Sequence, residues 1–255
     1  MNESRLTARI RAAGKAGRKA LIPFLPAGFP DKARFWDEIA ALDAAGADII
    51  EIGVPFSDPV ADGPVVEQAS LDCLALGVCL SWLLGELAVR RSSIQAEIVL
   101  MGYLNPFLQY GLERFAKDAA NAGVAGIIVP DLPFEEADEI KSALEAQGID
   151  LIWLVGLNTP AERLATYSNT ARGFVYLVSV LGTTGERESL PEEIAAKVAE
   201  VRQTFSIPVA LGFGIKTPQQ LAPFADAIDA VVFGSALISH LRTGAGAADF
   251  MARWR

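Results

Sequence analysis

Short runs of apolar residues alternate along this chain with longer segments whose apolar positions recur at helical spacing. Eight such runs occur, at 20–25, 48–54, 96–101, 126–129, 151–155, 173–179, 209–213 and 230–233. A helical pattern fills most of the intervals, as at 32–45, 112–122, 135–147, 161–168, 192–205 and 218–225. The alternation predicts a repeated strand and helix unit.

Glycines mark the ends of three predicted helices, at Gly46, Gly123 and Gly148. Eight strands at this spacing fit a closed (β/α)8 TIM barrel better than an open doubly wound sheet. A leading helix near residues 3–15 would cover the bottom of that barrel. No linker or low-complexity segment divides the chain, so we expect residues 1–255 to form a single TIM-barrel domain with an extra N-terminal helix.

Composition narrows the classes of partner. The net charge is −9 and no basic run is longer than Arg90-Arg91, which argues against binding to nucleic acid or to an anionic membrane. No stretch approaches about 20 uninterrupted apolar residues, and the N-terminus lacks the apolar block of a signal peptide. We therefore expect a cytoplasmic protein.

Cysteine, histidine and lysine usage bears on cofactors. Cys73 and Cys79 lie in one predicted helical region without a metal-ligand spacing, so we interpret both as packing residues. The single histidine, His240, lies in the probable last helix and is interpreted as a surface or packing residue, which argues against a histidine-rich metal site. None of the seven lysines lies inside a predicted strand, where a Schiff-base nucleophile would be expected. These patterns favour acid-base catalysis with no metal and no cofactor.

A carboxylate interrupts the second apolar run. Ile50 and Ile52 flank Glu51 in what the pattern predicts to be a strand buried on both faces. An unpaired ionised carboxylate there costs on the order of several kcal/mol, so burial should raise the pKa of Glu51 and favour its protonated form. The alternative is a buried ion pair with an arginine.

A second carboxylate, Asp62, follows in the loop after that strand, at the end of the barrel where chemistry occurs. We expect its pKa to stay near the ordinary value, so that one carboxyl moves a proton at carbon and the other handles a heteroatom proton. The alternative is a helix N-cap or a turn residue, since Gly63-Pro64 comes next.

Small residues follow the last two predicted strands, as Gly212-Phe213-Gly214 and Gly234-Ser235. Backbone N–H groups can approach an anion there, which is the usual phosphate position of such barrels. Gly185 could supply another donor. Lys216 is the only nearby cation, so main-chain donors and helix dipoles should hold the anion. Ordinary tight turns are the alternative reading.

The segment 51–64, EIGVPFSDPVADGP, resembles the signature of the tryptophan synthase alpha chain family. Four further segments match that family in order, at 101–106, 129–133, 173–176 and 212–215, and the resemblance runs from Pro23 to about Leu241. It implies a lyase that splits indole-3-glycerol phosphate into indole and D-glyceraldehyde 3-phosphate. It also implies that Asp62 accepts or stabilises the indole N–H proton, while Glu51 protonates indole C3 and then takes the hydroxyl proton.

The same resemblance assigns further residues. It implies substrate contacts at Phe24, Met101, Tyr176 and Phe213, and phosphate contacts at Gly185, Gly214, Gly234 and Ser235. It implies a beta chain that uses pyridoxal phosphate, joined in an alpha2beta2 tetramer through Pro55, Phe56, Asp58, Asn105 and Asp131. Phe56 could equally pack under its own loop. The loop at 179–189 would close over the substrate.

The sequence leaves three alternative functions open. The glycine turns alone also fit another phosphate-binding barrel enzyme, such as a thiamin-phosphate synthase or a phosphoribosyl isomerase type. The chain could act mainly as an activating partner of a beta chain, although both carboxylates are retained. It could also be a free-standing lyase that releases indole, and only partner binding separates this possibility from an alpha subunit.

Overall fold

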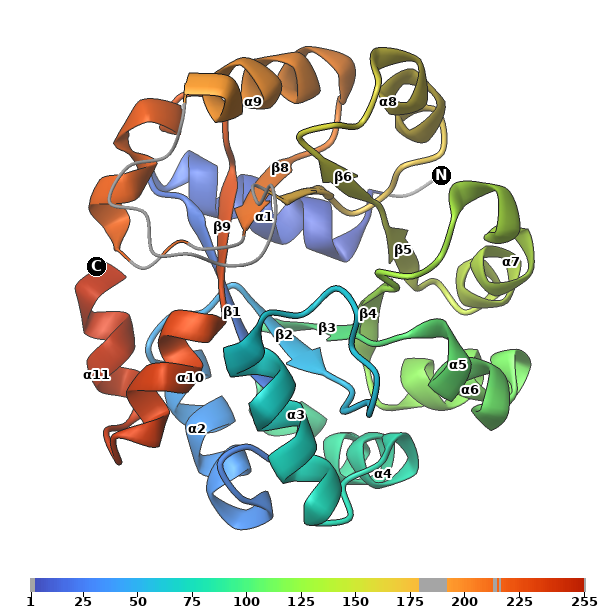
Figure 1. The fold of residues 1–255 in the computed structure, drawn as a ribbon, viewed down its shortest axis with the longest axis vertical. Helices are drawn as coiled ribbons and strands as arrows, with labels where there is room; N and C mark the ends of the chain where they lie inside the picture. Colours follow the sequence, from blue (N-terminus) through green and yellow to red (C-terminus); the bar gives the residue numbers. More distant parts are fainter. Residues whose placement is uncertain (1–2, 179–191, 213–214, 216, 255) are drawn as a thin grey trace.

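The computed structural model describes residues 3–178, 192–212, 215 and 217–254. Nine parallel strand segments form one sheet in the order β5-β4-β3-β2-β1-β9-β8-β7-β6. They are β1 Ala20–Pro26, β2 Ile49–Gly53, β3 Glu97–Met101, β4 Val124–Ile128, β5 Asp150–Ile152, β6 Leu154–Gly156, β7 Val175–Val178, β8 Val209–Gly212 and β9 Ala230–Phe233. The strands wind into a barrel with the helices arranged around it (Figure 1).

The two ends of the strand order are neighbours in the sequence. The apolar run predicted as one strand at 151–155 is divided into β5 and β6, with only Trp153 between them. β5 pairs with β4, whereas β6 pairs with β7 and the Trp153 carbonyl accepts a hydrogen bond from Tyr176 N–H at 3.0 Å. These two segments together take the fifth strand position, so the predicted (β/α)8 barrel is confirmed.

Helices follow most strands, as parallel connections require. The α-helices are α1 Arg5–Lys15, α2 Lys32–Ala44, α3 Pro64–Ala75, α4 Leu80–Arg90, α5 Leu104–Tyr110, α6 Leu112–Asn121, α7 Asp138–Ala146, α8 Ala161–Ser168, α9 Glu192–Thr204, α10 Ser235–Arg242 and α11 Ala247–Met251. The 3-10 helices are η1 Arg91–Ser93, η2 Phe134–Glu136, η3 Pro218–Phe224 and η4 Ala252–Trp254.

Two predicted helices differ from the expected form. The helix expected at 135–147 is split into η2 and α7. The helix expected at 218–225 is the 3-10 helix η3, which contains Pro223 and begins with a capping box at Thr217. Proline lacks the N–H that an α-helix needs at that position. The predicted helix ends are confirmed, because Gly46, Gly123 and Gly148 have φ values of 86°, 75° and 72°, which favour glycine.

Helix α1 closes the amino-terminal end of the barrel, as predicted. Arg5 Nη2 donates to the carbonyl of Val124 at the start of β4, at 3.1 Å. Thr7 Oγ1 donates to the carbonyl of Gly173, two residues before β7, at 2.6 Å. Leu6 is fully buried between these contacts. Ligand access to the barrel is therefore left to the opposite end, where the strands finish.

The two cysteines do not share a helix. Cys73 is buried in α3, but Cys79 is exposed at the N-cap of α4. The prediction that both pack in one helical region is thus wrong for Cys79, because the chain turns at Gly77, whose φ is 69°. His240 is half-buried in α10 and its ring centroid lies 5.6 Å from that of Phe250, in agreement with a packing role.

The last helix is α11 rather than α10, so the prediction that His240 lies in the final helix is wrong. Over the described ranges, no single helix is long and apolar enough to cross a membrane. The bent helix pair Pro64–Ala75 and Leu80–Ser93 would together be long and apolar enough, by length and composition alone.

Candidate active site

Strand β2 carries Glu51 into the barrel. Glu51 lies in register with Phe24 of β1 and with Val99 of β3. Side chains alternate along a strand, so Glu51 shares its face with Gly53, which lines a pocket at the strand ends. Glu51 is 1% exposed, and its Oε2 has no hydrogen-bond partner among the residues that the structure describes. No salt bridge to Glu51 occurs in the described part of the chain, which argues against the buried ion pair.

Burial is the main electrostatic influence on Glu51. Desolvation, followed by the negative charge of Asp62, raises the pKa of Glu51 to about 8. The expected protonated form is therefore confirmed as the main form at neutral pH. Such a carboxyl can act as a general acid.

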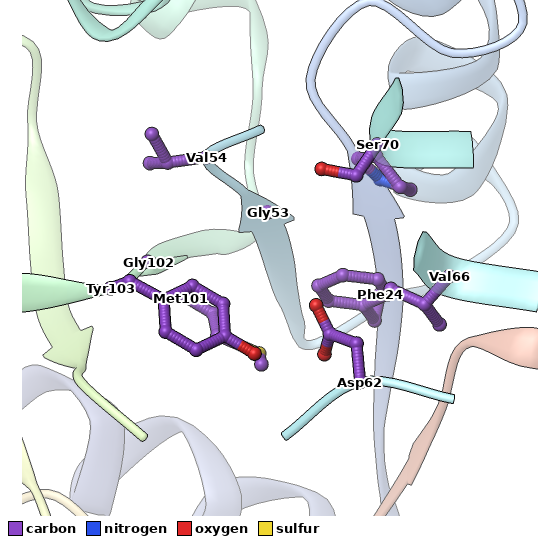
Figure 2. A pocket seen from close by; sticks show the side chains of 10 residues that line it. Phe24, Gly53, Val54, Asp62, Val66, Ser70, Met101, Gly102 and Tyr103 are labelled. Atoms are coloured by element: carbon purple, nitrogen blue, oxygen red, sulfur yellow. The ribbon is translucent and has the colours of Figure 1, made fainter. Parts of the chain in front are cut away.

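The pocket opens at the carboxyl ends of β1, β2 and β3. It is lined by Phe24, Pro26, Gly53, Val54, Asp62, Val66, Ser70, Met101, Gly102 and Tyr103. Figure 2 shows the Asp62 carboxyl in front of the Phe24 ring, with the Tyr103 hydroxyl directed toward it. The predicted substrate residues Phe24 and Met101 are thus brought together with Asp62 in one mostly apolar wall.

Asp62 lies in the loop between β2 and α3 and is half-buried. Desolvation raises its pKa to about 7; a hydrogen bond from Tyr103 opposes this rise, and the charge of Glu67 adds to it. The expectation of an ordinary pKa for Asp62 is wrong, because the loop folds back against the pocket wall. The N-cap of α3 is Gly63, without a side-chain hydrogen bond, so Asp62 is not the cap.

Tyr176 of β7 lies close to both carboxyls. Burial, followed by the charges of Glu51 and Asp62, raises its pKa well above the ordinary value. Tyr176 also lies against the backbone of Gly212, since a Cβ on that glycine would be 2.3 Å from Tyr176 Cε2. The third predicted substrate residue is therefore placed with the two carboxyls.

The predicted phosphate residues are only partly described. Gly234 is the N-cap of α10 and Ser235 is its first residue, without a side-chain capping bond. A Cβ on Gly234 would lie 2.7 Å from Phe24 Cδ1, so this turn is adjacent to the pocket. The residues outside the described ranges are Gly185, Phe213, Gly214 and Lys216, together with the loop at 179–189. Their roles stay predictions.

The predicted partner residues follow the carboxyl ends of β2, β3 and β4, and they differ in how much of each side chain is exposed. Asp58, Asn105 and Asp131 are exposed, whereas Pro55 is buried. Phe56 is half-buried and stacks on Tyr103 with ring centroids 5.3 Å apart. Part of the Phe56 ring therefore packs against the molecule's own core.

The sequence analysis assigned no role to several residues of the pocket wall, among them Val66, Ser70 and Tyr103. Val66 and Ser70 stand one helical turn apart on α3, directly after the Asp62 loop, and that spacing is a signal that could have identified them. Tyr103 follows β3 at the strand end, which is the position where barrel chemistry is expected.

Comparison with known proteins identifies the family. The model of the family described as tryptophan synthase alpha chain matches residues 10–253. The chain belongs to this family. It is 68% identical over 255 residues to the tryptophan synthase alpha chain of Solidesulfovibrio magneticus, with 100% of each chain covered. It is 60% identical over 254 residues to that of Nitratidesulfovibrio vulgaris strain DP4, covering 100% of this chain and 99% of the relative.

Solved structures agree with this assignment. Tryptophan synthase of Mycobacterium tuberculosis superposes with a TM-score of 0.90 at 37% identity, covering 100% of this chain and 99% of the other. A structure of the tryptophan synthase α2β2 complex of Pyrococcus furiosus superposes with a TM-score of 0.85 at 35% identity, covering 92% and 95%. The resemblance seen in the sequence is confirmed, and the other phosphate-binding barrel enzymes are excluded as the family.

Proposed function

We propose that this chain cleaves indole-3-glycerol phosphate to indole and D-glyceraldehyde 3-phosphate through Glu51 and Asp62, without a cofactor. This retro-aldol reaction is that of the tryptophan synthase alpha chain family, a family of carbon–carbon lyases. The observation that carries the proposal is the buried carboxyl of Glu51, with a pKa of about 8 and an Oε2 that has no hydrogen-bond partner among the described residues, on the strand face of Gly53, which lines the pocket together with Asp62.

Glu51 acts first as an acid. Its proton goes to C3 of the indole ring, and the ring becomes an indolenine whose bond to the glycerol side chain is weakened. When that bond breaks, its electron pair returns to the ring and restores indole. The side-chain hydroxyl on the cleaved carbon loses its proton to the Glu51 carboxylate and becomes the aldehyde of the second product.

Asp62 supports the same step from the ring nitrogen. Protonation at C3 places positive charge on the indole nitrogen, and an ionised Asp62 stabilises that charge or accepts the N–H proton. The competent enzyme thus needs Glu51 protonated and Asp62 ionised. With pKa values of about 8 and about 7, this state is most populated between those two values, and the carboxyls titrate as a coupled pair.

The remaining pocket residues position the substrate in this proposal. Phe24, Met101, Tyr176 and Phe213 surround the indole and glycerol parts. The phosphate binds at Gly185, Gly214, Gly234 and Ser235. The position of the start of α10 beside Phe24 supports the phosphate assignment at Gly234 and Ser235, because the free N–H groups at the start of a helix favour an anion.

The test is indole release from indole-3-glycerol phosphate by the purified chain. Glu51→Gln should abolish cleavage and Asp62→Asn should reduce it strongly, while both variants still bind D-glyceraldehyde 3-phosphate. Glu139→Gln, which changes an exposed glutamate of α7, is the matched control and should cleave at the wild-type rate. Substantial turnover by Glu51→Gln would remove Glu51 from the mechanism.

We also propose that the chain assembles with a tryptophan synthase beta chain into an alpha2beta2 tetramer in the cytoplasm. The similar Pyrococcus furiosus structure is of an α2β2 complex. In this chain Asp58, Asn105 and Asp131 are exposed in the segments that follow β2, β3 and β4, and the apolar side chains of Val60 (85% exposed) and Leu108 (49% exposed) are exposed in the first two of these segments. Exposed apolar residues beside charged ones suit a protein interface.

Adding a beta chain to the cleavage assay tests this assembly. Slow release alone and faster release with the beta chain would support an alpha subunit under allosteric control. Fast release alone, with no complex on size-exclusion chromatography, would favour a free-standing lyase. A chain that only stimulates the beta reaction would be an activating partner.

A further inference from the structure

Tyr103 contacts the Asp62 loop at two neighbouring residues. Its hydroxyl oxygen accepts a hydrogen bond from the Ala61 N–H at 3.0 Å. The same hydroxyl is directed toward the Asp62 carboxyl (Figure 2), and its hydrogen bonding lowers the pKa of that carboxyl. Tyr103 is 3% exposed and forms the pocket wall opposite Phe24 (Figure 2). One hydroxyl therefore bonds to the backbone of this loop and faces its carboxyl.

The direction of these hydrogen bonds is fixed by what each group can do. A backbone N–H can only donate, so the hydroxyl oxygen accepts the hydrogen bond from Ala61. The hydrogen of the hydroxyl is then available for donation to Asp62. Burial, followed by the charge of Asp62, raises the pKa of Tyr103 well above its ordinary value. Tyr103 therefore remains a donor throughout the range in which Asp62 titrates.

The Tyr103 ring is held in place on two sides. It stacks on Phe56 at an interplanar angle of 28°, and the Phe56 N–H donates to Ser70 Oγ of α3 at 3.1 Å. Tyr103 is also the N-cap residue of α5, whose Leu104 N–H donates to Asp131 Oδ1 at 2.9 Å. The hydroxyl thus has little freedom to follow Asp62 if that loop moves.

We infer that Tyr103 is a positioning residue that holds Asp62 ionised and directed into the pocket. This inference rests on the proposed function, in which Asp62 acts as the carboxylate. Desolvation and the charge of Glu67 both favour the neutral form of Asp62, and the Tyr103 hydrogen bond is the influence that opposes them. A hydroxyl donating to a carboxylate stabilises the charged form over the neutral one.

The test compares Tyr103→Phe with a matched Tyr→Phe change. Tyr103→Phe removes one oxygen and keeps the ring that stacks on Phe56. Tyr110→Phe removes a similar hydrogen bond, from the Tyr110 hydroxyl to Asp118 Oδ2 at 2.8 Å, at a half-exposed place outside the pocket. Indole release is measured for both variants and the wild type from pH 6 to pH 9.

Losing a hydrogen bond to a charged group should raise the pKa of Asp62 from about 7 by about one unit, so cleavage by Tyr103→Phe should fall about fivefold at pH 7 and about tenfold at pH 6. The acidic limb should move up by about one pH unit, the deficit should narrow as pH rises, and KM should change less than twofold. Tyr110→Phe should match the wild type. An unshifted acidic limb in Tyr103→Phe, or the same deficit at every pH, would overturn the inference.

A second measurement separates this inference from the proposed function. An inactive wild-type chain would refute the proposed function. The pKa of the Asp62 carboxyl can still be followed by 13C NMR on aspartate-labelled protein, with its signal identified by loss in Asp62→Asn. A higher pKa in Tyr103→Phe than in the wild type would support the positioning role, and an unchanged pKa would contradict it.

Discussion

Replacing Glu51 by glutamine should make the stability of this protein less dependent on pH. Glutamine has nearly the shape of a protonated glutamate and cannot ionise. The wild-type carboxyl has a pKa of about 8 in the folded chain, against an ordinary value of 4.5 for a glutamate in water. Between these two values the folded state holds a proton that the unfolded state has released, so the free energy of unfolding falls as pH rises.

The size of this effect follows from the two pKa values. Each unit of pKa difference corresponds to about 1.4 kcal/mol, and the penalty grows through the window from pH 4.5 to pH 8. Between pH 5 and pH 8 the wild type should lose roughly 3 to 4 kcal/mol from this one group. Glu51→Gln should not show that loss, so its stability advantage over the wild type should grow by the same amount.

Urea unfolding at pH 5 and pH 8 measures the difference between the two proteins. Glu139→Gln, at an exposed position, is the control and should differ from the wild type by the same amount at both pH values. A change of less than about 1 kcal/mol in the Glu51→Gln advantage would mean that Glu51 ionises in the folded chain almost as it does in the unfolded chain. The acid role derived from its burial would then be refuted.

Three further predictions test other parts of the structure. Asp62→Asn should lower the pKa of Glu51, because the charge of Asp62 contributes to raising it, so the loss of unfolding free energy between pH 5 and pH 8 should become smaller. Gly212→Ala should reduce kcat/KM at least tenfold, on the order of 1.4 kcal/mol, because its Cβ would displace Tyr176; a normal value in the cleavage assay would contradict this. Asp48→Asn should lower stability by about 2 kcal/mol in urea unfolding, because buried Asp48 accepts from Arg18 at 2.6 and 2.8 Å and from Leu21 N–H at 3.0 Å.

The sequence alone determined most of the fold and the first of the two carboxyls proposed to be catalytic. Strand positions could be read because parallel strands covered on both faces require nearly continuous apolar runs. The burial of Glu51 followed from its β-branched neighbours, and its raised pKa followed from burial. These conclusions depend on residues adjacent in the chain, so a local pattern was sufficient.

Tertiary structure decided the features that depend on residues far apart in the chain. The apolar run at 151–155 could not show that β5, before Trp153, pairs with β4 while β6, after Trp153, pairs with β7. That division depends on how the barrel closes. The sequence predicted an ordinary pKa for Asp62, but the Asp62 loop folds against the pocket wall, where burial raises that pKa. The hydroxyl of Tyr103, 42 residues away from Ala61 in the chain, accepts a hydrogen bond from the Ala61 N–H of this loop. Desolvation and hydrogen bonding are set by such contacts, and only the folded chain brings them together.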